Sequence, residues 1–360
     1  MGVISTLVGL AVLAFVIVFL YYIMIGLPNS PFGNISIPAL GGGGTTSLNY
    51  PNVTTSISNY VPNNQTIAYA LSLINHDRNK YGLANVSISN ETSAQQHSDS
   101  MLQNHYFSHW DVYGMKPYMR YTLLGGRQQV TENIAYIYNS SGINVLKSLK
   151  TMEYNMMYND LQCCNNGHRD NILDPTHNQV SIGVSYNSTT IYFAEDFIDN
   201  YTTWFYGTPS YSNGDVALKG QFLAPYNLSE VEISYDTQVQ NMTVAQLDNT
   251  SSYGYGSTVA GIGYWNNNRY YSFPSLTTIN ASTYTVQGHK FDVNFNMSSL
   301  ISQNGAGEYS VLVFVTDSAP GQPASCSTNS QGIKYCNGFL AASYTIFINA
   351  SGKQYTPQYV

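Results

Sequence analysis

The chain has 360 residues, of which 9% are charged and 43% are hydrophobic, and its formal net charge is −7. This length suits two folded domains with additional segments better than one domain. Because Lys and Arg are scarce, the chain has no basic surface on which DNA or RNA would bind, so the composition excludes a nucleic-acid partner. Tyr, Asn, Ser and Thr supply most of its polar groups.

The N-terminal segment is apolar enough to cross a membrane. Residues 3–26 carry no charged side chain, and as a helix they would reach about 36 Å, more than the ~30 Å of a hydrocarbon core. The alternative is a cleaved signal peptide, which has a basic start, a shorter apolar core and a small-residue cleavage site. The chain starts with Met1-Gly2 and shows no such cleavage site, so we predict a retained transmembrane anchor over residues 1–27.

Acceptor sequences for N-linked glycans indicate on which side of the membrane the chain lies. They occur at roughly twice the rate expected from the Asn, Ser and Thr content. This excess favours an external surface on which glycans are attached over acceptor sequences that arise by chance in an Asn-rich chain. We therefore predict a single-pass glycoprotein of the cell membrane with the bulk of the chain extracellular. The acceptors are Asn34, Asn52, Asn64, Asn85, Asn90, Asn139, Asn187, Asn200, Asn227, Asn241, Asn249, Asn280, Asn296 and Asn349.

A linker and three helices are expected after the anchor. Residues 28–65 are rich in Pro, Gly, Ser, Thr and Asn, a composition typical of a flexible linker. Apolar residues then recur at helical spacing in three segments. These predicted helices cover residues 67–81, about 91–105, and 143–160.

A small sheet completes the first predicted domain. Residues 180–186 and 191–197 alternate between apolar and polar side chains, and the turn residues between them predict a β-hairpin. Residues 66–203 are therefore expected to form an α+β domain, with helices around this sheet.

The remaining residues, 204–360, have a different character. About seven short alternating runs separated by turn residues, without a helical pattern, predict an all-β sandwich. The segment Gly307-Glu308-Tyr309 resembles the entry to a late strand of immunoglobulin-like folds, where a Tyr hydroxyl fixes a corner. We therefore predict an immunoglobulin-like sandwich.

The four cysteines form two groups. Cys326 and Cys336 flank a short loop, and we expect them to form a disulfide outside the cell. Cys163 and Cys164 are adjacent, and a disulfide between neighbouring residues is uncommon. They could be free thiols, or one of them could pair elsewhere.

Several short motifs occur in an order that resembles a known family. They are L-x-x-x-N-x-x-R at residues 71–78, YFSHWD at 106–111, ENIA at 132–135 and GHRDNIL at 167–173. Together with the predicted hairpin, they are similar to the CAP superfamily of cysteine-rich secretory, antigen 5 and pathogenesis-related 1 proteins, also called SCP-like. The segments PYMRYTLLGG (residues 117–126) and EYNMMYND (residues 153–160) are similar to those of archaeal members. The resemblance implies an α-β-α sandwich for residues 66–203.

The resemblance also implies a site. In this family two histidines and two glutamates line a solvent-filled cleft and can bind Zn²⁺ or another divalent metal. The motifs place His109, Glu132 and His168 in this tetrad, with both histidines as metal ligands. Glu153 is the fourth member, although Lys150 stands where the family commonly has Trp.

We expect a membrane-anchored extracellular protein that binds a ligand or a cell-surface partner. Its membrane contact would be residues 3–26, and its ligand a lipid, a glycan or a surface protein. An open apolar groove beside the tetrad would agree with this function. The first alternative is a metal-dependent hydrolase acting on surface peptides or envelope polymer, which requires all four tetrad side chains to meet around one point. The second is a structural component of a glycosylated cell-surface coat.

Overall fold

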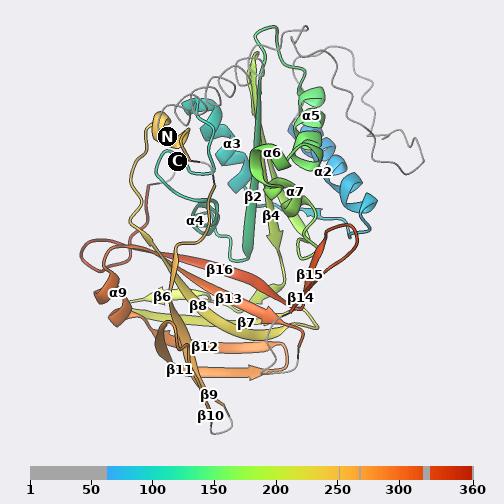
Figure 1. Cartoon of the computed structure of the whole chain (residues 1–360). Helices are drawn as coiled ribbons and strands as arrows, with labels where there is room; N and C mark the ends of the chain where they lie inside the picture. The colour runs from blue at the N-terminus through green and yellow to red at the C-terminus, as the bar shows by residue number, and fades with distance from the viewer. Residues whose placement is uncertain (1–62, 251, 267–268, 319–324, 359–360) are drawn as a thin grey trace, which may run out of the picture. The chain divides into compact units, whose positions relative to one another are not determined.

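The structure is a computed structural model, and it describes residues 63–250, 252–266, 269–318 and 325–358 (Figure 1). The predicted anchor at residues 3–26 and nearly all of the predicted linker lie outside the described residues. Within the described ranges, no helix is long and apolar enough to cross a membrane. All described residues belong to one compact unit, Tyr50–Val360.

The first domain is built on a four-stranded sheet in the order β1-β3-β4-β2. The hairpin of β3 and β4 agrees with the prediction, and β2 pairs with β4 in antiparallel register so that Glu132 lies opposite Asp196. Strand β2 is an edge of the sheet and was not predicted as a strand. The strands are β1 (Ser87–Ile88), β2 (Gln129–Tyr138), β3 (Gln179–Tyr186) and β4 (Thr190–Asp199).

Helices cover both faces of this sheet (Figure 1). On one face, α2 and α5 pack on a core that includes Ile182 and Phe193. On the other, α3 packs on Ala194 and α4 packs beside Ile198. Because successive strand residues point to opposite faces, β4 contributes to both cores, and the domain has three layers. The helices are α2 (Asn63–Lys80), α3 (Ser93–Asn104), α4 (Pro117–Leu123), α5 (Val145–Tyr158), α6 (Leu161–Cys164) and α7 (Gly167–Ile172).

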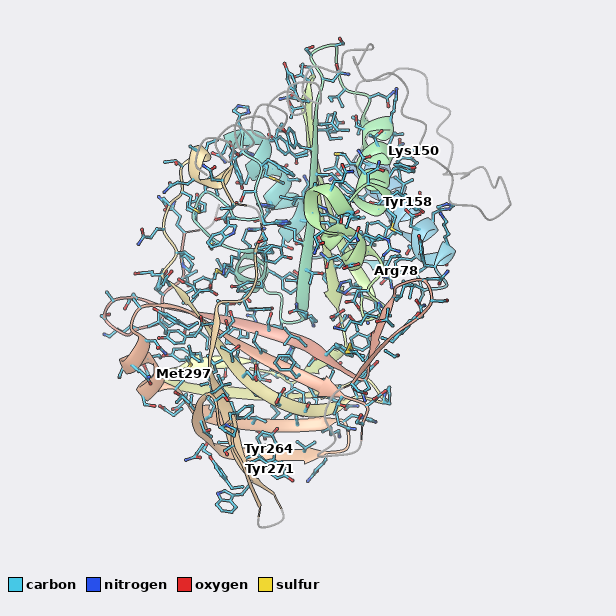
Figure 2. All side chains as sticks on the ribbon, in the orientation of Figure 1. Arg78, Lys150, Tyr158, Tyr264, Tyr271 and Met297 are labelled. Carbon is cyan, nitrogen blue, oxygen red and sulfur yellow. A yellow bond between two sulfur atoms is a disulfide. The ribbon has the colours of Figure 1, made fainter. Side chains whose placement is uncertain are left out.

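Two residues of the first helical motif hold the loops around it. Asn75 of α2 exchanges two hydrogen bonds with the backbone of Val86, at 2.8 and 3.0 Å. Arg78 is fully buried and donates to the backbone carbonyls of Ile172 and His177, at 2.8 and 3.0 Å (Figure 2). These contacts fasten the segment after α7, so this part of the motif is structural.

The C-terminal region is rich in β-structure, as predicted. Its strands form a ten-stranded sheet whose main path runs β16-β13-β8-β9-β11-β12-β7-β5. Strand β11 is parallel to β9 over residues 277–280 and antiparallel to β12 over residues 281–287, so it belongs to both halves of the sheet. One core unites the halves, with Leu218 of β7 and Ile233 of β8 both fully buried in it.

This region also contains elements that the sequence prediction lacked. Two short helices, α8 and α9, interrupt the strands. Thr243 and Gln246 form a capping box at the start of α8, and the side chain of Asn296 accepts from the backbone N–H of Ser298 at the start of α9. The elements are β5 (Thr202–Trp204), β6 (Ser210–Ser212), β7 (Asp215–Phe222), β8 (Asn227–Thr237), α8 (Val244–Leu247), β9 (Ser257–Asn266), β10 (Arg269–Tyr271), β11 (Thr277–Gln287), β12 (Lys290–Asn296), α9 (Ser298–Asn304), β13 (Gly307–Thr316), β14 (Cys326–Thr328), β15 (Lys334–Cys336) and β16 (Gly338–Ile348).

Both pairs of cysteines form disulfides. Cys326 and Cys336 join β14 to β15, which confirms that prediction. Cys163 and Cys164 are bonded to each other at the end of α6. This vicinal disulfide answers a question that the sequence left open.

Candidate functional site

An open pocket of about 380 Å³ lies along the edge strand β2. Three of the four predicted tetrad residues, His109, Glu132 and His168, line it, and Glu153 does not. The other lining residues are Tyr118, Gln129, Val130, Thr131, Asn133, Cys164, Gly167, Asn171, Ser252, Tyr253, Gly254 and Tyr255. The run of five consecutive residues from β2 in this set shows that the free edge of the sheet forms the floor of the pocket.

The two histidines reach this edge from opposite faces of the sheet. Neighbouring residues of a strand point to opposite faces, so Glu132 and Asn133 serve different sides. The Nδ1 atom of His109 lies 2.9 Å from Oε1 of Glu132. The side-chain amide of Asn133 donates to the backbone carbonyl of His168 at 3.1 Å. One imidazole therefore flanks each face of β2.

Glu132 is held by a buried cation. Its side chain has no exposed surface, and Nη2 of Arg120 donates to its Oε2 at 2.7 Å. Arg120 comes from α4 and also donates to the backbone carbonyls of His109 and Met115, each at 2.8 Å. Burial raises the pKa of Glu132 to about 7, while the Arg120 guanidinium acts in the opposite direction. The arrangement orients His109 and Glu132 together.

His109 is a neutral imidazole in this setting. Its pKa is lowered to about 3, mainly by burial, and the nearby His168 and Arg120 act in the same direction. With the Glu132 carboxylate beside Nδ1, we assign the proton to Nδ1, which donates to Glu132. The Nε2 lone pair of His109 is then available to a ligand in the pocket.

His168 has a carboxylate partner of its own. Its Nδ1 lies 2.6 Å from Oδ1 of Asp160, and Oδ2 of Asp160 accepts from the backbone N–H groups of His168 and Arg169. Burial opposes ionisation of Asp160, but these hydrogen bonds lower its pKa overall. Among the described residues, Nε2 of neither His109 nor His168 has a hydrogen-bond partner. Both imidazoles are therefore oriented through Nδ1 and free at Nε2.

Glu153 lies behind the pocket and is fully buried. It extends from α5 toward Glu195 of β4, and burial and that neighbouring carboxyl raise the pKa of Glu153 well above its usual range. No described N–H or O–H group donates to its carboxyl oxygens, so the contact with Glu195 is made by the proton of Glu153 itself. Glu195 in turn accepts from Asn133 at 3.3 Å, which links Glu153 to the pocket indirectly. The place of Glu153 on a predicted helix did not determine the direction in which its side chain points.

A second carboxyl pair lies on the opposite face of the sheet. Asp196, the neighbour of Glu195 on β4, lies beside Glu132 and is hydrogen-bonded by the hydroxyl of Ser93. Burial and the charge of Glu132 raise the pKa of Asp196 to about 8. Asp196 was not among the predicted site residues, although two consecutive acidic residues in a buried strand place one carboxyl on each face.

The C-terminal region supplies one wall of the pocket, residues 252–255. The backbone N–H of Glu132 donates to the hydroxyl of Tyr253, whose ring centroid lies 4.7 Å from that of His109. The hydroxyl of Tyr255 donates to Gln129 at 2.6 Å. Lys116 of the first domain donates to the carbonyl of Gly254 at 2.8 Å. No local motif signals this wall, because its contacts connect residues that are more than a hundred positions apart.

The tetrad does not form a compact metal cage. Among the described residues, its members do not bring three ligand atoms within 4.8 Å of one another, and the group that does consists of Asp160, Cys163, Cys164 and His168. His109 and His168 would hold a metal through Nε2, and the carboxylate at each Nδ1 is the outer contact common to metal-binding histidines. The residues therefore fit a metal in part, with two protein ligands.

The sequence comparison supports the family resemblance. Residues 71–206 match the profile of the cysteine-rich secretory protein family, CAP. This segment is a CAP domain. No curated protein matches the chain.

Solved structures with similarity to the chain include three bacterial proteins. An extracellular protein containing an SCP domain from Bacillus anthracis str. Ames is 24% identical, with a TM-score of 0.30, over 38% of this chain and 41% of that chain. An outer surface protein from Borrelia burgdorferi is 14% identical, with a TM-score of 0.31, over 39% and 96% of the two chains. The CAP domain of Enterococcal PrgA is 16% identical, with a TM-score of 0.29, over 44% and 70%. The chain thus spans less than half of the Bacillus protein.

Proposed function

We propose that this protein is an extracellular binding protein whose CAP domain holds a hydroxyl-rich ligand, a glycan, in the pocket along β2. The observation that carries the proposal is the pair of imidazoles, His109 and His168, each oriented by a carboxylate at Nδ1 and free at Nε2. A neutral imidazole nitrogen accepts a hydrogen bond and an imidazole N–H donates one, so both Nε2 atoms match hydroxyl groups, which donate and accept. Hydroxyl groups of a sugar meet this requirement.

The remaining lining favours a glycan over a lipid. Amide side chains come from Gln129, Asn133 and Asn171, and aromatic rings with hydroxyls come from Tyr118, Tyr253 and Tyr255. Amides both donate and accept, and Tyr rings present an apolar face with a polar end. Val130 is the aliphatic side chain of this set. The apolar surface of the pocket therefore belongs mainly to side chains that also carry a polar group, which suits both the carbon face and the hydroxyls of a sugar.

Three observations support an extracellular position with a membrane anchor at residues 3–26. Both cysteine pairs form disulfides, which persist in oxidising compartments. No glycan-acceptor Asn within the described residues is buried. The apolar N-terminal segment has the length of a transmembrane helix.

A divalent metal could strengthen ligand binding at this site, but the proposed function does not require one. Held by His109 and His168, it would supply a positive charge that polarises a ligand oxygen. The hydrolase alternative requires Glu153 at the same point, but Glu153 is buried beside Glu195 and absent from the lining. No observation favours that alternative over binding.

The test is a glycan-binding measurement on the full chain in detergent, first on a glycan array and then by calorimetry with the best glycan. We expect His109→Gln and His168→Gln each to weaken binding at least tenfold, which corresponds to about 1.4 kcal/mol of binding free energy. The matched control is His105→Asn, which replaces an exposed histidine whose φ of 56° Asn tolerates. Unchanged affinity in both pocket variants, or no glycan bound at all, would overturn the proposal and favour a structural role in a surface coat.

A further inference from the structure

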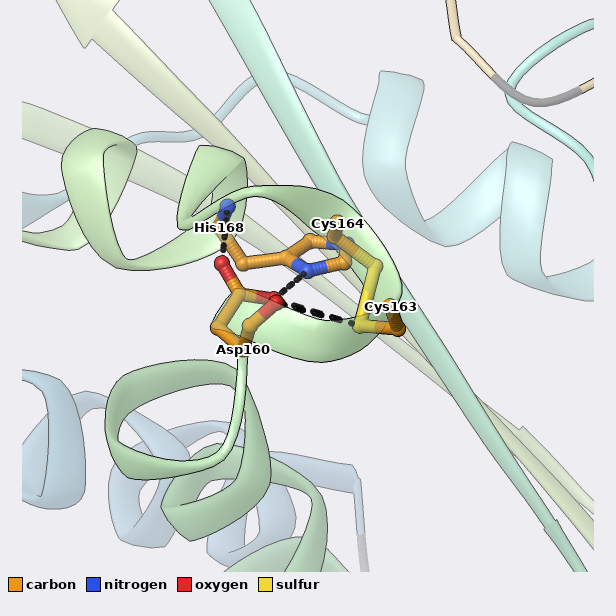
Figure 3. Close-up of side chains that lie close together, drawn as sticks. All are labelled: Asp160, Cys163, Cys164 and His168. Atoms are coloured by element: carbon orange, nitrogen blue, oxygen red, sulfur yellow. Dashed lines mark hydrogen bonds and ion pairs between the residues drawn. A yellow bond between two sulfur atoms is a disulfide. The ribbon is translucent and has the colours of Figure 1, made fainter.

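Four potential metal ligands lie together at the rim of the pocket. Asp160, Cys163, Cys164 and His168 each present a ligand atom, and these atoms all lie within 4.8 Å of one another (Figure 3). Nδ1 of His168 is 2.6 Å from Oδ1 of Asp160, and Sγ of Cys163 is 3.5 Å from that oxygen. The cluster differs from the family tetrad, with which it shares only His168.

The backbone between α6 and α7 brings these groups together. Asn165 and Asn166 both have left-handed backbone conformations, with φ of 50° and 65°, which Asn tolerates better than most residues. The chain therefore reverses between Cys164 and His168. Asp160 then accepts hydrogen bonds from the backbone N–H of His168 at 2.9 Å and closes the turn. The ligand geometry is thus fixed by the fold of one short segment.

The donor set has the chemistry of a zinc site. Zn²⁺ takes four ligands from cysteine thiolates, imidazole nitrogens and carboxylate oxygens. Thiolates also favour Zn²⁺ and other thiophilic metals over Mg²⁺ and Ca²⁺. In the disulfide, however, the sulfurs of Cys163 and Cys164 are bonded to each other and neither is a thiolate. The redox state of this bond therefore decides whether two of the four ligands exist.

We propose that reduction of the Cys163–Cys164 disulfide creates a binding site for a thiophilic divalent metal, with Zn²⁺ as the reference ion, formed by both thiolates together with Asp160 and His168. A small-molecule thiol is the reductant. Two thiol molecules transfer two electrons and two protons to the disulfide, the S–S bond breaks, and the reductant leaves as its own disulfide. Metal binding then releases the two thiol protons to solvent, and the Nδ1 proton of His168 moves to Nε2, so that Nδ1 can be the ligand.

The position of the pair allows this exchange. Cys163 is exposed and Cys164 is half-buried, so a small reductant can reach the bond. Cys164 and His168 also line the pocket, so the metal would sit at its rim. The inference does not rest on the proposed glycan function: the two sites share His168, but the metal site uses neither His109 nor Glu132 and requires no bound glycan.

Zinc titration of the full chain in detergent tests the proposal, using calorimetry before and after reduction with a phosphine that binds zinc weakly. We expect one Zn²⁺ per reduced chain, bound more than about 100-fold more tightly than by the oxidised chain, because two ligands are gained and loss of an outer contact alone costs 10- to 100-fold. Co²⁺ serves as an optical probe, since thiolate ligation gives a sulfur-to-cobalt charge-transfer band. The band is expected only after reduction.

Variants separate this site from the second disulfide and from the glycan pocket. Cys163→Ser with Cys164→Ser should abolish both tight binding and the cobalt band. Cys326→Ser with Cys336→Ser is the matched control, because it leaves Cys163–Cys164 as the remaining disulfide, and it should behave like the wild type. His109→Gln should weaken glycan binding and leave the tight zinc binding that follows reduction unchanged, because His109 is not one of the four ligands of that site.

Three results would overturn the metal site. They are equal zinc affinity in the oxidised and reduced chains, tight binding that survives the loss of Cys163 and Cys164, and a folded reduced chain without the cobalt band. Circular dichroism on the Cys326→Ser/Cys336→Ser variant verifies that the reduced chain is folded. If that variant unfolds on reduction and added zinc does not restore its fold, the proposal is also wrong.

Discussion

The two faces of the CAP sheet each accommodate a buried pair of carboxyl groups, and they do so differently. Each face buries a pair of carboxyl groups beside the edge strand β2. The first pair is Glu132 and Asp196, and Arg120 forms an ion pair with it at 2.7 Å. The second pair is Glu153 and Glu195, with which no Lys or Arg of the described residues forms an ion pair.

The difference shows what a buried cation allows. A buried carboxylate is costly unless a partner compensates its charge, and two carboxyls in contact cannot both ionise cheaply. With Arg120 as its partner, Glu132 can be ionised and accept a hydrogen bond from the Nδ1–H group of His109. Without a cation, Glu153 stays protonated and donates to Glu195. On one face, Glu132 can therefore carry a negative charge beside the pocket. On the other face, Glu153 is neutral and supports Glu195 through a hydrogen bond.

The largest effect is expected from removing the cation of the first pair. Arg120→Met leaves Glu132 buried without its compensating charge, and the free energy of unfolding should fall by about 3–5 kcal/mol. Denaturant unfolding followed by circular dichroism measures the change. Arg169→Met is the control, because Arg169 pairs with the exposed Asp170 at 3.9 Å, and it should cost less than about 1 kcal/mol. Equal losses in both variants would remove the distinction between the two faces.

The wild type should lose stability as pH rises above about 6.5. The pKa values of Asp196, at about 8, and of Glu132 and Glu195, at about 7, exceed those of an unfolded chain, so the native state binds more protons. The pKa of His109, at about 3, acts in the opposite sense and only below its ordinary value of 6.5. Between about pH 6.5 and 8 the carboxyl groups dominate, and we expect a loss on the order of 2 kcal/mol. Thermal or denaturant unfolding across this range measures it, and a flat profile would contradict the expectation.

Glu153→Gln should reduce that loss. The amide keeps a donor for Glu195 but cannot ionise, so the second pair no longer penalises the native state at high pH. We expect a gain of about 1–2 kcal/mol at about pH 8, with little change at about pH 5. Unfolding at the two pH values provides the measurement. Glu132→Gln is the matched control and should destabilise instead, because Arg120 would lose its carboxylate; the same sign in both variants would refute the comparison.

The smallest effect is expected at the pocket wall from Tyr255→Phe, and Tyr253→Phe is the variant with which it is compared. Tyr253→Phe removes the acceptor of the Glu132 backbone N–H and should cost about 1–3 kcal/mol, as for a buried donor left without a partner. Tyr255→Phe removes a bond to the half-buried Gln129 and should cost about 0.5–1.5 kcal/mol. Chemical denaturation ranks the two variants. A larger loss of stability in Tyr255→Phe would contradict the expectation that the Tyr253 hydroxyl satisfies a buried N–H group of β2.

Local patterns predicted much of the first domain. Helices α3 and α5 and the hairpin of β3 and β4 carry their own apolar periodicity, which short-range spacing reveals. Strand β2 lacks such a pattern, because Glu132 and Asn133 are both buried by partners distant in sequence. The polar residues of β2 were therefore recognised as part of a motif, but the segment was not predicted to be a strand.

The site was predictable to a similar degree. Motif order located His109, Glu132 and His168, and the structure brings all three to one pocket; their part in binding stays a prediction. The direction of Glu153 depends on which neighbour α5 packs against, which spacing alone does not contain. The pairing of Cys163 with Cys164 and the wall around Tyr253 depend on the folded backbone.

The wall at residues 252–255 has an evolutionary consequence. The family profile ends at residue 206, so the segment that matches the family is smaller than the unit that encloses the pocket. Recombination that moved the CAP segment into another protein would carry both histidines and leave Tyr253 behind. Ligand choice could then diverge through exchange of the companion region while the histidines stay the same, so relatives are best compared by what covers their β2 edge.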